Sequence, residues 1–109
     1  MIEDAHEELD IPDGVQGTKR ATEVIRAWIA DGGLHVALSP EVFSHDVSEW
    51  GRLLSDIASH VANAVALDGQ MDRKEAMQAI EAAFEKGLVH SAKRPAEAMT
   101  GKIKRGTRH

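Results

Sequence analysis

The chain has 109 residues, a length that fits one domain and is too short for two independent cores. Apolar residues make up 42% of it, charged residues 28% and aromatics only 4%, which indicates a globular protein with a mostly aliphatic core. It has no cysteine, which excludes disulfides, thiolate zinc sites, iron–sulfur clusters and a cysteine nucleophile. No apolar run approaches the roughly 18 residues that a membrane helix needs, and the acidic N-terminus is wrong for a signal peptide. We therefore expect a soluble, cytoplasmic protein without membrane contact.

Charge is divided unevenly along the chain, although the formal net charge is only −5. Residues 1–17 carry six acids and no Lys or Arg, whereas residues 91–109 carry six bases and one acid. Both end segments lack apolar periodicity and contain Pro and Gly, which is typical of mobile termini. The sequence predicts an acidic flexible tail over 1–17, one folded domain over 18–90 and a basic flexible tail over 91–109.

The first predicted element is a helix over about 19–31. Thr18 can cap its start, and Gly32 and Gly33 would end it. Its apolar residues recur at helical spacing: Ala21, Val24, Ile25 and Trp28.

A short strand is predicted next, over 34–38. Leu34, Val36 and Leu38 alternate so that they share one face, and Ser39-Pro40 stops the strand.

Two further helices are predicted over about 47–67 and about 73–86. Each begins after an aspartate that has a glutamate three residues on, the spacing of a capping box. The two pairs are Asp46 with Glu49 and Asp72 with Glu75. Gly87 followed by Leu88 is typical of a helix end. The order α-β-α-α predicts a compact α+β domain.

A single strand needs a partner, because an isolated strand leaves two rows of backbone groups unpaired. Segments 9–15 and 88–90 and Ile103 are poor partners, being broken by Pro and Gly, very short or highly charged. We therefore expect strand 34–38, with Val36 at its centre, to pair antiparallel with its own copy across a homodimer.

Asp56 and His60 are the most plausible chemical pair, since residues four apart share one side of a helix. Together they fit an acid–base pair or part of a metal site. A solvated ion pair is the favoured reading, because a metal needs three or four ligands and one helix supplies two or three. We expect no catalytic residue, no metal and no cofactor.

His35 is predicted on the strand face opposite the leucines, as a surface residue.

The basic C-terminal residues form a cluster that could contact phosphates: Lys102, Lys104, Arg105 and Arg108. No aromatic residue interleaves with them to stack bases, and no nucleic-acid-binding motif precedes them. Strong nucleic-acid binding is therefore not expected.

Three motifs carry a resemblance to a known family. They are E-x-x-R-x-W from Glu23, L-H-V-x-L from Leu34, and W-G-x-L-L-x-D-I-A-x-H-V-A from Trp50. In this order they resemble a family of small bacterial proteins, commonest in alphaproteobacteria, that is catalogued as a domain of unknown function. The resemblance covers about residues 20–66 and implies no activity, ligand or partner. The residues that match the pattern are Glu23, Arg26, Trp28, His35, Trp50, Gly51, Asp56 and His60.

These features together favour a dimeric interaction or structural module. The alternative is an anion or nucleic-acid binder that uses the basic C-terminal tail. An enzyme or metal site at Asp56 and His60 ranks third.

Overall fold

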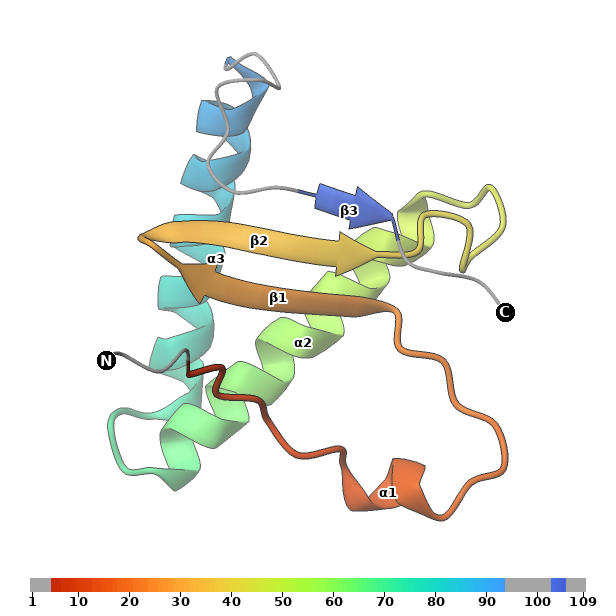
Figure 1. Ribbon diagram of the computed structural model, residues 1–109. Helices are drawn as coiled ribbons and strands as arrows, with labels where there is room; N and C mark the ends of the chain where they lie inside the picture. The colour runs from red at the N-terminus through yellow and green to blue at the C-terminus, as the bar shows by residue number, and fades with distance from the viewer. Residues whose placement is uncertain (1–4, 94–102, 106–109) are drawn as a thin grey trace, which may run out of the picture.

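The computed structural model describes residues 5–93 and 103–105, which form a small sheet and a helical hairpin (Figure 1). The elements in chain order are α1 (Asp13–Gln16), β1 (Ile25–Ala30), β2 (Gly33–Leu38), α2 (Ser48–Leu67), α3 (Arg73–Ala92) and β3 (Ile103–Arg105). The predicted α+β class is confirmed. None of the described helices has the length and apolar character to cross a membrane.

The predicted helix over 19–31 is wrong, because this segment forms β1 and the chain leading to it. The sequence fits a strand as well as a helix, because Ile25, Ala27 and Ile29 lie two residues apart and so share one face of a strand. The turn after this segment shows that the strand is the one formed. Asp31 and Gly32 both have positive φ, at 51° and 75°, as a two-residue hairpin turn of type I′ requires.

The strand predicted over 34–38 is confirmed as β2, but its expected pairing with a second copy is wrong. β2 is the central strand of the sheet order β1-β2-β3. It pairs antiparallel with β1, with Ala27 opposite Val36. On its other edge it pairs parallel with β3, with Val36 opposite Ile103. Both edges of β2 therefore find partners within the chain.

The two later helices are confirmed, with one corrected boundary. α2 coincides with the predicted 47–67 to within a residue. α3 starts as predicted, where the Asp72 side chain caps it by accepting a hydrogen bond from the Lys74 N–H. Its predicted end at Gly87 is wrong, because the helix continues to Ala92. Glycine is permitted inside a helix at a cost of about 1 kcal/mol, so it does not by itself end one.

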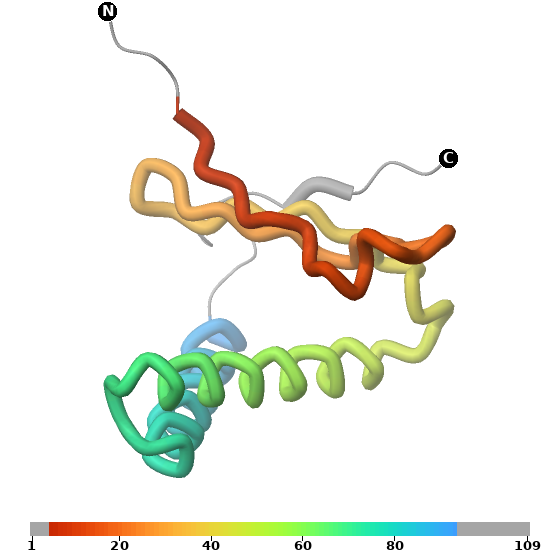
Figure 2. The backbone as a smooth tube through the Cα atoms, turned by 90° about the horizontal axis from the view of Figure 1, so that it is seen from below, coloured from red at the N-terminus to blue at the C-terminus, as the bar shows by residue number. Residues whose placement is uncertain are grey.

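The sheet and the helices form two layers, and α2 runs obliquely away from α3 (Figures 1 and 2). Ala62 of α2 and Ala76 of α3 are the buried apolar residues, with 0% and 3% exposure. Near the same end of the hairpin, Arg73 Nε donates a hydrogen bond to Asn63 Oδ1. Among the described residues, no Cα atom of either helix comes within 8 Å of a Cα atom of the sheet. The closest packing therefore lies between the helices, near the loop that joins them.

The division of the chain into two tails and a domain over 18–90 stays a prediction. α1 falls inside the predicted N-terminal tail and β3 inside the predicted C-terminal tail.

Candidate functional site

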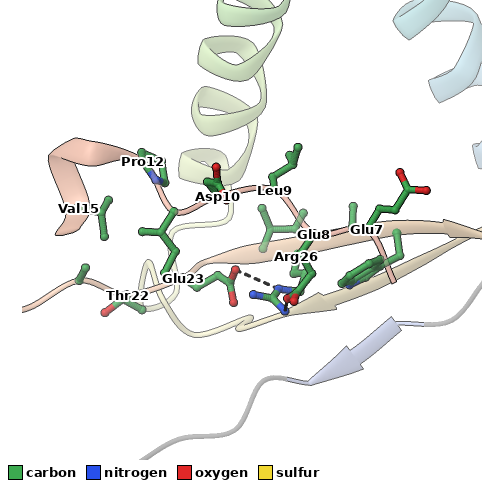
Figure 3. Close-up of a pocket in the computed structure, with 14 residues that line it drawn as sticks. Glu7, Glu8, Leu9, Asp10, Pro12, Val15, Thr22, Glu23 and Arg26 are labelled. Carbon is green, nitrogen blue, oxygen red and sulfur yellow. Dashed lines mark hydrogen bonds and ion pairs between the residues drawn. The ribbon is translucent and has the colours of Figure 1, made fainter. Parts of the chain in front are cut away.

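The best-formed polar cluster lies on β1 and is centred on Arg26. Its Nη1 atom lies 3.2 Å from Glu8 Oε2, and its Nε atom lies 3.2 Å from Glu23 Oε2. Glu23 is three residues before Arg26, whereas Glu8 comes from the N-terminal segment, which passes beside β1 (Figure 3). The cluster therefore ties that segment to the sheet.

Trp28 completes this cluster, because residues two apart on a strand share one face. The Arg26 Cζ atom lies 6.0 Å from the centroid of the Trp28 ring, at the outer limit of a cation–π contact. His6 approaches the same ring edge-on, with centroids 6.0 Å apart and ring planes at 63°. Trp28 is half-buried and lies opposite His35 in the strand register. One indole thus contacts both the sheet and the N-terminal segment.

A groove of about 530 Å³ lies between the N-terminal segment and β1 (Figure 3). Its apolar lining includes Leu9, Ile11 and Ile25, and its carboxylates include Glu7 and Asp10. Acidic side chains outnumber the single guanidinium, so the groove repels anions. The guanidinium is also held by two carboxylates, so binding a phosphate there would first require breaking both ion pairs.

The ion pairs of the cluster are open to water. The side chain of Arg26 is 46% exposed, and those of Glu8 and Glu23 are 60% and 62% exposed. Pairs of this kind contribute about 0–1 kcal/mol each, because water screens their attraction. The cluster orients the N-terminal segment more than it stabilises the fold.

The other family-pattern residues lie elsewhere. Trp50 packs edge-on against Phe43, with ring centroids 5.3 Å apart, where the chain enters α2. Gly51, Asp56 and His60 are exposed along α2. Within the described part of the chain, Asp56 and His60 form no ion pair, whereas Arg52 Nη1 lies 3.0 Å from Glu49 Oε1. No group of three or more metal-ligating side chains occurs among the described residues.

The structure thus brings together Glu23, Arg26 and Trp28, with His35 beside them, and leaves the α2 residues separate. Sequence reasoning missed the N-terminal contribution of His6 and Glu8. No periodicity marks that segment, and its acids alone indicate only a solvated tail. The one available signal was electrostatic, since an acidic segment precedes a strand that carries an arginine.

Comparison with known proteins identifies the family. A family model described as "Domain of unknown function (DUF5076)" matches residues 8–92. The chain belongs to this family. The resemblance inferred from the three motifs is thereby confirmed. The match runs from Glu8 through α3, so it includes Glu8, Glu23, Arg26 and Trp28 of the cluster and the helical hairpin, but not His6.

One solved structure similar to this DUF5076 chain comes from the photosynthetic bacterium Rhodopseudomonas palustrus and is provisionally described as a pyruvate dehydrogenase. The two sequences are 35% identical, and the TM-score is 0.62. The alignment covers 84% of this chain and 90% of that one. No curated protein matches the chain.

Proposed function

We propose that the chain is a homodimeric interaction module that acts in the cytoplasm through binding rather than catalysis. The supporting observation is its incomplete core. Among the described residues, Ala62 and Ala76 are the only buried apolar ones, while fourteen large apolar side chains are exposed. Exposure reaches 78% at Ile29 and 89% at Leu67. A folded domain of this size ordinarily buries roughly 60–70% of the surface that its unfolded chain exposes.

This exposure bears on stability. Fixing the backbone costs about 1–2 kcal/mol per residue, and burial of apolar surface is the main term that offsets it. Burying a large aliphatic or aromatic side chain contributes about 1.5–3 kcal/mol, whereas an alanine contributes much less. Burying these exposed side chains against a second copy would therefore stabilise the protein. A two-fold homodimer is the commonest arrangement that does so, because the same surface is buried on both chains.

Two features favour binding to protein over other activities. The best-formed polar cluster consists of exposed charges at Arg26 that pair with one another, which does not favour the enzyme activity named for the Rhodopseudomonas relative. A net charge of −5 opposes approach to the phosphates of a nucleic acid.

The test is the mass of the full chain in solution. Light scattering after size exclusion at about 100 μM should give twice the chain mass of 11.9 kDa, since a dissociation constant near 1 μM would leave most chains paired at that concentration. Dilution should then lower the average mass. A single species of 11.9 kDa at about 100 μM would overturn the proposal.

A further inference from the structure

The outer edge of β1 has no strand beside it, because β1 is the end strand in the order β1-β2-β3. In a hairpin with a two-residue turn, Ala30 and Gly33 form the first hydrogen-bonded pair, and such pairs recur at every second residue. The bond from the Ser39 N–H to the Val24 carbonyl, 3.4 Å long, continues this alternation. The backbone groups that point away from β2 therefore belong to the alternate residues: Ile25, Ala27 and Ile29. Within the described part of the chain, these groups form no hydrogen bond.

The N-terminal segment, residues 5–12, passes beside this edge without pairing with it. Figures 1 and 2 place the segment on the side of β1 away from β2. Its contacts with β1 are made by side chains, Glu8 with Arg26 and His6 with Trp28, and no backbone hydrogen bond joins the two segments as the structure describes them. The groove of about 530 Å³ lies between them and is lined by four consecutive residues of β1, 25–28. Consecutive strand residues point to opposite faces, so the groove follows the edge of the strand.

The two walls of the groove alternate apolar and polar residues. On β1 the apolar residues of one face alternate with Arg26 and Trp28 on the other. On the facing segment, Leu9 and Ile11 alternate with acids. Leu9 is 96% exposed although it lines the groove, so its side chain is open to a ligand. An extended ligand that alternates in the same way would match both walls.

The charge of the groove selects a basic ligand. Its lining contains a single cationic side chain, Arg26, and four carboxylates: Glu7, Glu8, Asp10 and Glu23. Glu8 and Glu23 pair with Arg26, whereas Glu7 and Asp10 form no ion pair with any described residue. We propose that the groove binds an extended peptide in which lysine or arginine alternates with apolar residues, and that this peptide pairs antiparallel with β1 as an added strand. The proposal rests on the interaction role proposed above, although it does not require the homodimer.

Antiparallel pairing fixes which peptide residues face which wall. Residues directly opposite each other point to the same face, and those that exchange hydrogen bonds with the free edge lie opposite Ile25, Ala27 and Ile29. The apolar peptide residues therefore face the apolar side of β1 and supply the N–H groups that bond its edge. The basic residues fall on the other face, where Glu8 and Glu23 outnumber Arg26.

A synthetic peptide of alternating lysine and valine, capped at both ends, tests the proposal with the full chain. It should bind with a dissociation constant below about 1 mM, measured by the fluorescence anisotropy of a label on the peptide. A peptide of alternating glutamate and valine has the same β propensity at the apolar positions and should not bind. No binding of the lysine peptide, or equal binding of the two peptides, would overturn the proposal.

N-methylation of the peptide tests the strand pairing itself. Methylating the valine nitrogens removes the N–H groups that bond β1, whereas methylating the lysine nitrogens removes those that point away from it. The first change should raise the dissociation constant at least about tenfold relative to the second, because it removes several backbone hydrogen bonds. Equal affinities of the two methylated peptides would show that the edge is not paired.

Variants of the protein test the groove. Glu7→Gln combined with Asp10→Asn should raise the dissociation constant of the lysine peptide at least about threefold, because both carboxylates line the groove. Glu81→Gln combined with Glu85→Gln removes the same charge from exposed positions of α3 and should leave the constant within about twofold. Equal effects of the two double variants would assign binding to net charge and refute the groove.

The protein concentration separates this proposal from the dimer. A dissociation constant that rises with protein concentration would show that a second copy occupies the edge, and would refute the peptide as its partner. A monomeric wild-type chain that binds the lysine peptide would refute the dimer alone, whereas a dimer that does not bind it would refute this proposal alone.

Discussion

Replacing Ala62 with leucine probes the contact that holds the helical hairpin together. Ala62 is fully buried, at 0% exposure, and Ala76 on the facing helix is 3% exposed. Leucine is a good helix former, so the change adds bulk with little effect on intrinsic helix propensity. The added carbons must displace α3 or adopt a strained rotamer. Overpacking of this kind costs about 1–3 kcal/mol.

The matched control is Ala82→Leu, which makes the same change at an exposed position of α3. The control should alter the free energy of unfolding by less than about 0.5 kcal/mol. For a domain of this size the predicted loss at Ala62 corresponds to a fall in Tm of about 5–20 °C. Both variants should be measured by urea and thermal unfolding at one fixed protein concentration, because association shifts apparent stability. An Ala62→Leu variant as stable as the control would show that the helices do not pack closely there.

Two further predictions concern single positions. Gly32→Ala should lower the free energy of unfolding by about 1–2 kcal/mol, because φ is +75° at this position. Gly51→Ala, inside α2, should raise the free energy of unfolding by about 0.5–1 kcal/mol, because alanine favours the helix and its Cβ would meet nothing within 4 Å. Chemical denaturation of both variants checks the opposite signs, and equal effects would contradict the type I′ turn. Asp56→Asn should change stability by less than about 0.5 kcal/mol, because the side chain is exposed and forms no ion pair among the described residues. A loss of several kcal/mol in the same assay would indicate that Asp56 is buried in an interface.

The long helices and the central strand could be predicted because their signals are local and strong. α2 repeats apolar residues over five turns, and Asp72 caps α3 with its own side chain. β2 alternates Leu34, Val36 and Leu38 before a proline. None of these patterns depends on residues far away in the sequence.

β1 was mistaken for a helix because short apolar runs fit both periods. The Asp31-Gly32 pair was the informative signal, since Asp-Gly between apolar runs is among the strongest indications of a β-hairpin. Gly32-Gly33 also fits a helix end, so this signal is ambiguous on its own. Once β1 is assigned, β2 has a partner within the chain, and no argument for pairing it across a dimer remains.

The Arg26 cluster could be predicted only in part. The E-x-x-R-x-W motif places Arg26 and Trp28 on one face of a strand, but on opposite sides of a helix, so their proximity follows only once β1 is assigned. The approach of His6 and Glu8 depends instead on the path of an irregular segment, which no local pattern encodes. Contacts between such a segment and a strand become visible only once the tertiary structure is known.

β2 pairs with β1, which is adjacent to it in sequence, and with β3, which is far from it in sequence, and this difference affects how the chain folds. β1 joins it through a two-residue turn, and α2 meets α3 through a short loop, so both hairpins can close locally and fast. β3 pairs with β2 only after some 65 residues have been looped out between Val36 and Ile103. The entropy of closing so long a loop opposes that step until the hairpins are in place. We therefore expect the two hairpins to form before β3 docks, so that the parallel edge of the sheet assembles last.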